Sequence, residues 1–354
     1  MAYEDAQSQD SQWTAFRNAE KKYKLYKNTK LKRPAADLSE VLDFRAILHS
    51  FVQNGTTPPG IFKLNRDFDR PVFCFEERPG FYFIPGAIGI EEQCYWVRES
   101  LTSFPQPPNR TNHNAIYGEI QDLFLAVQGQ RLLVEVGDPI AAVNHRINSD
   151  EKPLNLDDRR WAFMEKTSGI SNGSRKSIDA AVLLRKLRWS TLGLQFDWSK
   201  RNYDNSLAHN KIPDKLCHLA KKLAAPAVEK GDFKPEAAIV NYFGSDDTLG
   251  GHLDDMEEDW SKPIVSISLG CKAIFLLGGD SREDPPIAMF VRSGDVVLMA
   301  GPARECFHGI PRIFTNEENA EVSPLVAEFL RQEDCYFVDY IRTSRININI
   351  RQVH

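Results

Sequence analysis

The sequence lacks the features that mark secreted and membrane proteins. Its six cysteines are scattered, with no CxxC pair and no regular spacing, which argues against a disulfide framework or a cysteine-ligated zinc site. No apolar run reaches the length of a membrane span, and the first residues, MAYEDAQSQD, resemble neither a secretory signal nor an arginine-rich transit peptide. We therefore expect reduced thiols, no membrane contact, and a location in the cytoplasm, the nucleus or both, with an organelle left open.

The chain also has little net charge. It carries 44 Lys and Arg against 49 Asp and Glu, for a net charge of -5, and 42% of its residues are hydrophobic. This balance is ordinary for a globular protein, and 354 residues suffice for one large core or two smaller ones. An average near neutrality does not announce a nucleic-acid-binding protein, but it can hide a local basic stripe. Local motifs therefore have to identify the function.

Short strands dominate the chain after Pro235. The segments are AAIVNYF, PIVSISLG, KAIFLLGG, PIAMFVR, GDVVLMAG and RININIR, separated by glycine and proline turns. Closely spaced short strands of this kind favour an antiparallel jelly roll or barrel. The predicted class is α+β, with a jelly-roll (double-stranded β-helix) core and helices packed around it.

The region before this core is predicted to be mostly helical or irregular. Asp37 and Glu40 have the spacing of a capping box and Gly55 marks the end of the same helix. The segments IEEQCYWVRESLTSF and IPDKLCHLAKKLAAP also have helical patterns. Residues 105–175 are rich in proline, asparagine and glycine and are predicted to form loops and short helices. We expect a helical extension over residues 1–70, helices and loops packed on the core over 71–235, and the core itself over 236–354.

The stretch GGHLDDMEEDW places a histidine two residues before an aspartate. In a strand, residues i and i+2 point to the same face, so His252 and Asp254 can converge on one point. A second histidine, His308, follows the GDVVLMAG segment. Two histidines and one carboxylate on one face of a metal are typical of non-haem Fe(II) oxygenases. The alternatives are a solvated acidic loop, a hydrogen-bonded core histidine and a zinc hydrolase.

The last strand carries a second signal. Arg345, Asn347, Asn349 and Arg351 alternate with isoleucines, so one face of the strand is apolar and the other is rich in hydrogen-bond donors. An edge strand with a solvated polar face would look similar. If the polar face of this strand pointed into a barrel, however, its arginines would offer a guanidinium fork to a dicarboxylate. The dicarboxylate that suits an open ferrous site is 2-oxoglutarate.

Taken together, NYF, HLD, His308 and RxNxxxR resemble the AlkB family of Fe(II)/2-oxoglutarate dioxygenases, in the branch of the first AlkB homologue of animals and plants. The resemblance is dense from about residue 183 to residue 353. It implies that His252, Asp254 and His308 bind iron and that Arg345 pairs with the distal carboxylate of 2-oxoglutarate. The other residues implied at the co-substrate site are Asn241, Tyr242, Asn347 and Arg351.

Two points in this motif bear on the chemistry. The resemblance places Arg351 near both the other carboxylate of the co-substrate and the target base, among the catalytic residues. Phe243 stands where many family members have a tyrosine that contacts the co-substrate. Tyr242 should point to the opposite face of its strand and cannot simply replace that tyrosine.

The resemblance implies oxidative removal of N-methyl groups from nucleobases, with Fe(II), 2-oxoglutarate and dioxygen. The expected substrates are 1-methyladenine in tRNA and related RNA, or 6-methyladenine in DNA. A base must leave its stack to reach buried iron. The segment from Arg185 to Tyr203 offers aromatic rings and five basic residues for this purpose, as a nucleotide-recognition lid; the basic residues are Arg185, Lys186, Arg188, Lys200 and Arg201. The expected substrate-binding residues are Trp189, Phe196, Trp198, Lys200, Arg201 and Tyr203. The alternative is a set of core aromatics with a solvated basic rim.

Two other functions stay open. An oxygenase with the same iron site can act on a protein such as a methylated histone tail, and the acidic patch of Asp255, Glu257, Glu258 and Asp259 would favour a basic peptide. A non-catalytic binding module would require a broken site, whereas all three candidate ligands are present. We expect a monomer, and residues 309–344 form either a lid or a docking surface.

Overall fold

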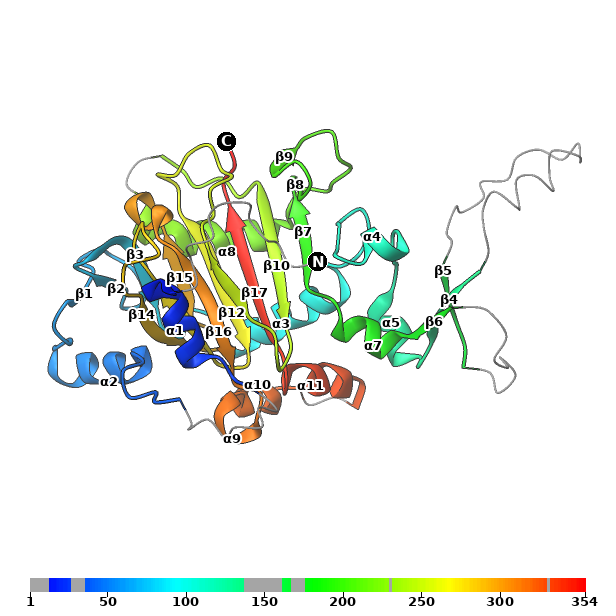
Figure 1. Cartoon of the computed structure of the whole chain (residues 1–354), viewed down its shortest axis with the longest axis horizontal. Helices are drawn as coiled ribbons and strands as arrows, with labels where there is room; N and C mark the ends of the chain where they lie inside the picture. The colour runs from blue at the N-terminus through cyan, green and yellow to red at the C-terminus, as the bar shows by residue number, and fades with distance from the viewer. Residues whose placement is uncertain (1–12, 27–35, 137–160, 167–175, 229–230, 330–331) are drawn as a thin grey trace, which may run out of the picture.

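Two antiparallel sheets face each other in the computed structural model, which describes residues 13–26, 36–136, 161–166, 176–228, 231–329 and 332–354 (Figure 1). The larger sheet has the order β1-β2-β3-β15-β12-β17-β10-β7, and the smaller has the order β11-β16-β13-β14. This arrangement confirms the predicted α+β class with a jelly-roll core. The strands of the larger sheet are β1 (Ile61–Lys63), β2 (Phe73–Phe75), β3 (Arg78–Ile84), β7 (Trp189–Gly193), β10 (Ala237–Phe243), β12 (Ile264–Gly270), β15 (Val296–Met299) and β17 (Arg345–Arg351). Those of the smaller sheet are β11 (Leu249–His252), β13 (Ala273–Leu277), β14 (Ile287–Val291) and β16 (His308–Ile313).

The core is not confined to residues 236–354. Strands β1, β2, β3 and β7 all precede residue 236, yet they complete both edges of the larger sheet. The register joins β3 to β15 through Phe83↔Val297 and β7 to β10 through Thr191↔Ile239. The chain before residue 236 therefore supplies strands as well as the expected helices.

Strand β17 lies between β12 and β10 in the middle of the larger sheet. Its isoleucines, Ile346, Ile348 and Ile350, are fully buried in the main hydrophobic core. Helices α3 (Ile90–Thr102) and α8 (Asp214–Ala224) contribute to that same core, with Trp96 and Leu216 among their buried residues. Both helices were predicted, and they cover the outer face of the sheet, so the polar face of β17 turns toward the smaller sheet.

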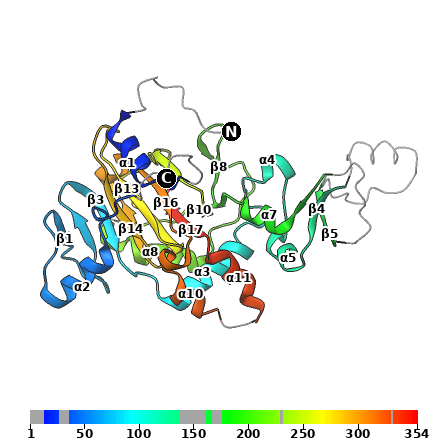
Figure 2. The same ribbon diagram turned by 60° about the horizontal axis from the view of Figure 1, so that its bottom comes forward.

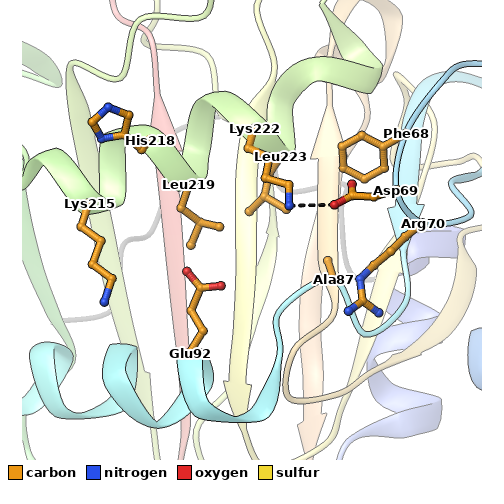
Figure 3. A pocket seen from close by; sticks show the side chains of 10 residues that line it. All are labelled: Phe68, Asp69, Arg70, Ala87, Glu92, Lys215, His218, Leu219, Lys222 and Leu223. Atoms are coloured by element: carbon orange, nitrogen blue, oxygen red, sulfur yellow. Dashed lines mark ion pairs between the residues drawn. The ribbon is translucent and has the colours of Figure 1, made fainter.

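A groove between these two helices is bridged by polar contacts (Figure 3). Lys222 of α8 pairs with Asp69 of the β1–β2 connection at 2.7 Å. Lys215 of the same helix lies over the ring of Tyr95 of α3, 3.3 Å from its centroid. These contacts tie α8 to its neighbours on the outer face, away from the space between the sheets.

The N-terminal helices cover the smaller sheet and its edge. Helix α1 (Ala15–Tyr23) packs on β11, β13 and β16 (Figure 1). Helix α2 (Phe44–Asn54) ends at Gly55 in the left-handed conformation, as expected, but its N-cap is Asp43 and not Asp37. The carboxylate of Asp43 accepts the N–H groups of Arg45 and Ala46, so the helix begins six residues later than predicted.

Two small sheets flank the core. Strands β8 (Gln195–Asp197) and β9 (Asn202–Asp204) form a hairpin directly after β7; we call residues 194–205 the lid. A three-stranded sheet of β5 (Trp161–Met164), β4 (Leu132–Glu135) and β6 (Ser177–Asp179) stands away from the core beside α4 (Asn114–Tyr117), α5 (Leu123–Gln128) and α7 (Ala180–Arg185) (Figure 1). The expectation of loops and short helices over 105–175 missed β4 and β5; residues 137–160 and 167–175 lie outside the described part.

The excursion between β16 and β17 forms α9 (Glu317–Ala320), α10 (Ser323–Ala327) and α11 (Cys335–Ile341). Phe337 of α11 stacks on Phe124 of α5, with ring centroids 4.4 Å apart. Arg98 of α3 donates two hydrogen bonds to Asp334, at 2.9 and 3.0 Å. Figure 2 shows α10 and α11 beside α3, so this segment supports the outer helices. Across the described residues, no helix has the length and apolar character needed to cross a bilayer.

Replacing Ile348 by alanine should lower the free energy of unfolding by about 2–5 kcal/mol, because it removes buried carbons from the central strand and leaves a cavity. Urea denaturation followed by circular dichroism measures this change. Val182→Ala, at a side chain that is 45% exposed, is the matched control and should change stability little. An Ile348→Ala variant as stable as the control would contradict the central position of β17.

Candidate active site

A cavity of about 370 Å³ lies between the two sheets. Strands β10, β12 and β17 provide its polar wall, and β11, β13, β15 and β16 contribute apolar residues, which are Leu249, Phe275, Val297, Met299 and Ile310. Lid residues Phe196, Trp198 and Arg201 also line it. All three expected metal ligands and the expected co-substrate arginine open into this one space.

The three candidate metal ligands come together at one end of the smaller sheet. His252 ends β11, His308 begins β16, and the two are directly paired across the strands. Asp254 follows two residues after His252, and the ligand atoms of the three side chains all lie within 4.8 Å of one another. Because the donors are two imidazoles and one carboxylate, the set fits a ferrous ion with open coordination positions.

Local contacts orient these ligands. The Nδ1 atom of His252 lies 2.9 Å from the carbonyl oxygen of Gly250, which leaves Nε2 to face Asp254. Burial, and then the charge of His308, lowers the pKa of His252 to about 4, so its imidazole is neutral and can bind a metal at neutral pH. Burial alone would raise the pKa of Asp254, but Arg351 and the two histidines hold it well below its usual range. His252 and Asp254 are therefore held in the protonation states that metal binding requires.

Helix α1 fixes the strand that carries His252. The carboxylate of Glu20 accepts the N–H of Gly251 at 2.7 Å, and Arg282 donates to the carbonyl oxygen of Gly251 at 2.8 Å. The ring of Phe16 lies so close to Gly251 that a Cβ atom there would be 2.4 Å from it. Only glycine fits at this position, which explains the residue that precedes the first ligand.

Arg345 is buried at the other end of the cavity, and its guanidinium has N–H donors that are available to a ligand. Its Nη2 atom donates to the hydroxyl of Ser268 at 2.9 Å, whereas Nε and Nη1 are buried and have no hydrogen-bond partner in the described part of the chain. Burial lowers the pKa of this guanidinium to about 10. An unpaired buried cation is costly, and a carboxylate bound in the cavity would match its charge and accept hydrogen bonds from the guanidinium. The residues present therefore fit the distal carboxylate of 2-oxoglutarate.

The asparagines of the polar wall are arranged around this point. Asn347 donates to the hydroxyl of Ser266 at 2.9 Å and to the carbonyl oxygen of Ile267 at 3.0 Å. Asn349 donates to the side-chain oxygen of Asn347 at 3.0 Å. Asn241 pairs with Asn347 across β10 and β17 and also lines the cavity.

The prediction that Tyr242 lies at the co-substrate site was wrong. Its side chain is 1% exposed within the outer core, and its hydroxyl donates to the carbonyl oxygen of Ser100 at 2.6 Å. Phe243 pairs with Arg345 across the strands and lies in the inner core, on the face where a co-substrate hydroxyl contact would be made. Neither residue can donate a hydrogen bond into the cavity.

The six residues expected to bind the substrate occupy four kinds of position. Phe196, Trp198 and Arg201 line the cavity. Trp189 does not line it but packs behind Trp198, with ring centroids 5.2 Å apart. Tyr203 points inward and its hydroxyl hydrogen-bonds with Arg351 and with Glu257. Lys200 is exposed and pairs with Asp204 at 3.0 Å.

Glu257 is a site residue that the sequence pattern did not reveal. Its side chain is fully buried and pairs with Arg304 and Arg351. In the sequence it lies among three other acidic residues, a pattern that predicts a solvated acidic patch. No local pattern around His252 indicates a role for Glu257, because the residues that pair with it lie far away in the sequence.

Comparison with known proteins agrees with this geometry. Residues 161–351 match the family model for the 2OG-Fe(II) oxygenase superfamily. The chain belongs to this superfamily of Fe(II)- and 2-oxoglutarate-dependent dioxygenases, and the predicted use of Fe(II), 2-oxoglutarate and dioxygen is confirmed.

Within the superfamily, the chain is a member of the AlkB branch that the motifs predicted. It is 59% identical to the DNA N(6)-methyladenine demethylase ALKBH1A of Arabidopsis thaliana, over 99% of both chains. It is 28% identical to the tRNA demethylase abh1 of Schizosaccharomyces pombe, over 97% of this chain and 96% of the relative. It is 30% identical to the human nucleic acid dioxygenase ALKBH1, over 93% of this chain and 83% of the relative.

The residues that line the cavity would have separate roles in the reaction. Bound Fe(II) and 2-oxoglutarate would supply an oxidation in which one oxygen atom of dioxygen enters a C–H bond and the other enters 2-oxoglutarate, which is split into succinate and carbon dioxide. His252, Asp254 and His308 would hold the metal from one side and leave the other side open to the cavity. Arg345 would orient the co-substrate from the far end, and the apolar lining would limit the entry of water.

Replacing His252, Asp254 or His308 by alanine should abolish succinate production and weaken Mn(II) binding strongly, because three ligands leave no spare. Electron paramagnetic resonance of added Mn(II) and a succinate assay measure these effects. His218→Ala, at an exposed histidine on α8, should match the wild type in both. Near-normal turnover in any of the three variants would contradict the metal assignment.

Arg345→Lys should weaken 2-oxoglutarate binding by about 1–3 kcal/mol, roughly 5- to 150-fold in Kd, because lysine cannot form the bidentate fork. Anaerobic calorimetry with Mn(II) in place of Fe(II) measures the Kd. Arg342→Lys, at an exposed arginine three residues away, is the control. Equal affinity in the two variants would show that β17 does not face the co-substrate.

Proposed function

We propose that this enzyme removes N-methyl groups from adenine in nucleic acid, with 1-methyladenine in tRNA and 6-methyladenine in DNA as the substrates to test. The observation that carries the proposal is the position of the lid. Phe196 and Trp198 line the same cavity as the metal triad, so a base flipped into that cavity would meet aromatic rings beside the oxidising centre. The activities for which the relatives are named, on DNA and on tRNA, support the same substrate class.

The indole of Trp198 is suited to this contact. Trp189 and Phe196 pack against it, with ring centroids 5.2 and 4.8 Å away, so its orientation is fixed before a base arrives. Its Nε1–H is buried without a hydrogen-bond partner among the described residues. A base edge with an acceptor would satisfy this donor, and the ring itself offers a stacking surface.

Fewer basic residues of this segment are suited to contact phosphate groups than its sequence suggested. Arg185 donates to the hydroxyl of Ser344 and to the carbonyl oxygen of Asp339, so it ties α7 to the end of α11. Arg188 pairs with Asp247 at 2.6 Å. Lys200 and Arg201 remain as the exposed cations of the lid, and we propose that they contact the nucleic-acid backbone.

The protein-substrate alternative loses part of its support. Glu257 is buried and paired, so it cannot attract a basic peptide. Asp255 lines the cavity and lies 3.7 Å from Arg201, which offsets its charge. Glu258 is exposed but lies near His354.

We also propose that the protein is located in the cytoplasm, the nucleus or both, where its free cysteines would stay reduced.

The substrate is tested by incubating the enzyme with Fe(II) and 2-oxoglutarate and with methylated tRNA, single- and double-stranded methylated DNA, or a methylated histone tail. Nucleoside and peptide mass spectrometry then measure demethylation. Trp198→Ala should lower turnover of the methylated base by about 1–3 kcal/mol, roughly 5- to 150-fold, because a stacking contact is lost. Trp13→Ala, at an exposed tryptophan, should behave like the wild type. Demethylation of the histone tail alone would overturn the proposal.

Nucleic-acid binding should fall with salt, with a log–log slope of roughly -1.4 to -1.8 when Lys200 and Arg201 each contact one phosphate. Alanine at both Lys200 and Arg201 should weaken every nucleic acid alike and make the slope shallower by about 1–2. Fluorescence anisotropy across a salt series measures both effects. Alanine at Lys221 and Lys222 of α8 is the charge-matched control. Binding that does not depend on salt would contradict the phosphate contacts.

A further inference from the structure

The buried carboxylate of Glu257 is the centre of a network that joins two parts of the active site. Its side chain has no exposed surface and accepts hydrogen bonds from Arg304 at 2.5 Å and from Arg351 at 3.0 Å. Arg304 and Arg351 are themselves buried, with 1% and 7% of their side chains exposed. A buried cluster of this kind persists only when its charges are matched and its hydrogen bonds are made.

One side of the network reaches the metal triad. Arg351 pairs through Nη2 with the Oδ1 atom of Asp254 at 3.0 Å. Arg304 donates from Nη2 to the backbone carbonyl oxygen of Asp254 at 2.8 Å. Both arginines that hold Glu257 therefore also hold the carboxylate ligand of the metal, one by its side chain and one by its backbone.

The other side of the network reaches the lid. The hydroxyl of Tyr203 donates to the Oε1 atom of Glu257 at 3.0 Å and accepts from Nη1 of Arg351 at 3.3 Å. Tyr203 belongs to β9, and its partner across the hairpin is Phe196, whose ring lies 5.2 Å away. Phe196 lines the cavity and packs on Trp198. The hydroxyl of Tyr203 therefore attaches the lid to the network.

We propose that Glu257 is a positioning residue that couples closure of the lid to occupation of the metal site. The inference goes beyond the proposed substrate and rests only on the metal triad. Two cations, Arg304 and Arg351, are matched in the network by two anions, Asp254 and Glu257. When a cation binds to Asp254, that carboxylate has less charge to share with Arg351. Arg351 then interacts more strongly with Glu257 and Tyr203, which draws the lid inward.

The coupling is reciprocal. If metal binding stabilises the closed lid, a closed lid must strengthen metal binding by the same factor. A base stacked under the lid would therefore tighten the site that is about to oxidise it. Glutamine at position 257 would keep the shape but leave one buried cation without a matching anion. Phenylalanine at position 203 would remove only the hydroxyl that joins the lid to the network.

Hydrogen–deuterium exchange of residues 194–205, with and without Mn(II), tests the coupling on the full-length protein. In the wild type, Mn(II) should slow exchange of the lid by about fivefold or more, the low end of ordinary coupling between sites. Tyr203→Phe should lose this slowing and still bind Mn(II), with an affinity reduced by no more than the lost coupling factor. Glu257→Gln should lose the slowing and also bind Mn(II) at least tenfold more weakly. Glu258→Gln, at a neighbouring side chain that is 72% exposed, should match the wild type in both measurements.

The outcomes separate the coupling from the other assignments. A wild-type response of the lid to Mn(II) in Tyr203→Phe would overturn the coupling, and so would wild-type Mn(II) affinity together with a wild-type lid response in Glu257→Gln. Tyr203→Phe loses one hydroxyl, so it keeps the test valid if Glu257→Gln does not fold. Failure of the wild type to bind Mn(II) would overturn the metal triad and the coupling together. Because no nucleic acid is present, an error in the proposed substrate leaves every result unchanged.

Discussion

The active site depends on the way β17 divides its side chains between two environments. Ile346, Ile348 and Ile350 pack into the outer core under α3 and α8, which fixes the register of the strand. Because side chains alternate in a strand, that packing forces Arg345, Asn347 and Asn349 into the space between the sheets. A slip of one residue would bury the arginines among leucines and turn the isoleucines into the cavity. The burial of three isoleucines therefore sets the position of the co-substrate site.

Strictly periodic or closely spaced features were predictable from the sequence. The alternation in β17, the His252-Asp254 pair and the helical patterns of α3 and α8 each specify a face from a short segment. The features that were missed depend on distant partners. Glu257 resembles its acidic neighbours in the sequence, and its burial is decided by Arg304, Arg351 and Tyr203, which are 47, 94 and 54 residues away. Tyr242 was misplaced for a different reason, since the motif was carried over to a residue that alternation turns to the other face.

The excursion between β16 and β17 shows how segments remote from the chemistry support it. Helix α11 packs on α5 through Phe337 and Phe124, and its C-terminal end accepts hydrogen bonds from Arg185 of α7. Helix α7 in turn leads directly into β7, the strand that carries the lid. An arginine that looked like a nucleic-acid contact thus has a structural task, because carbonyl oxygens at a helix end need donors. Charge in a sequence identifies a phosphate contact only when the protein itself leaves that charge exposed.

The unsatisfied guanidinium of Arg345 has a consequence for the folded chain as a whole. A buried cation with two free donors makes the empty protein less stable than its packing alone would allow. A ligand that binds only the folded state stabilises it by RT ln(1 + [L]/Kd), about 2.7 kcal/mol at a hundred times Kd. The resistance of this chain to unfolding and to proteolysis then rises with the concentration of 2-oxoglutarate.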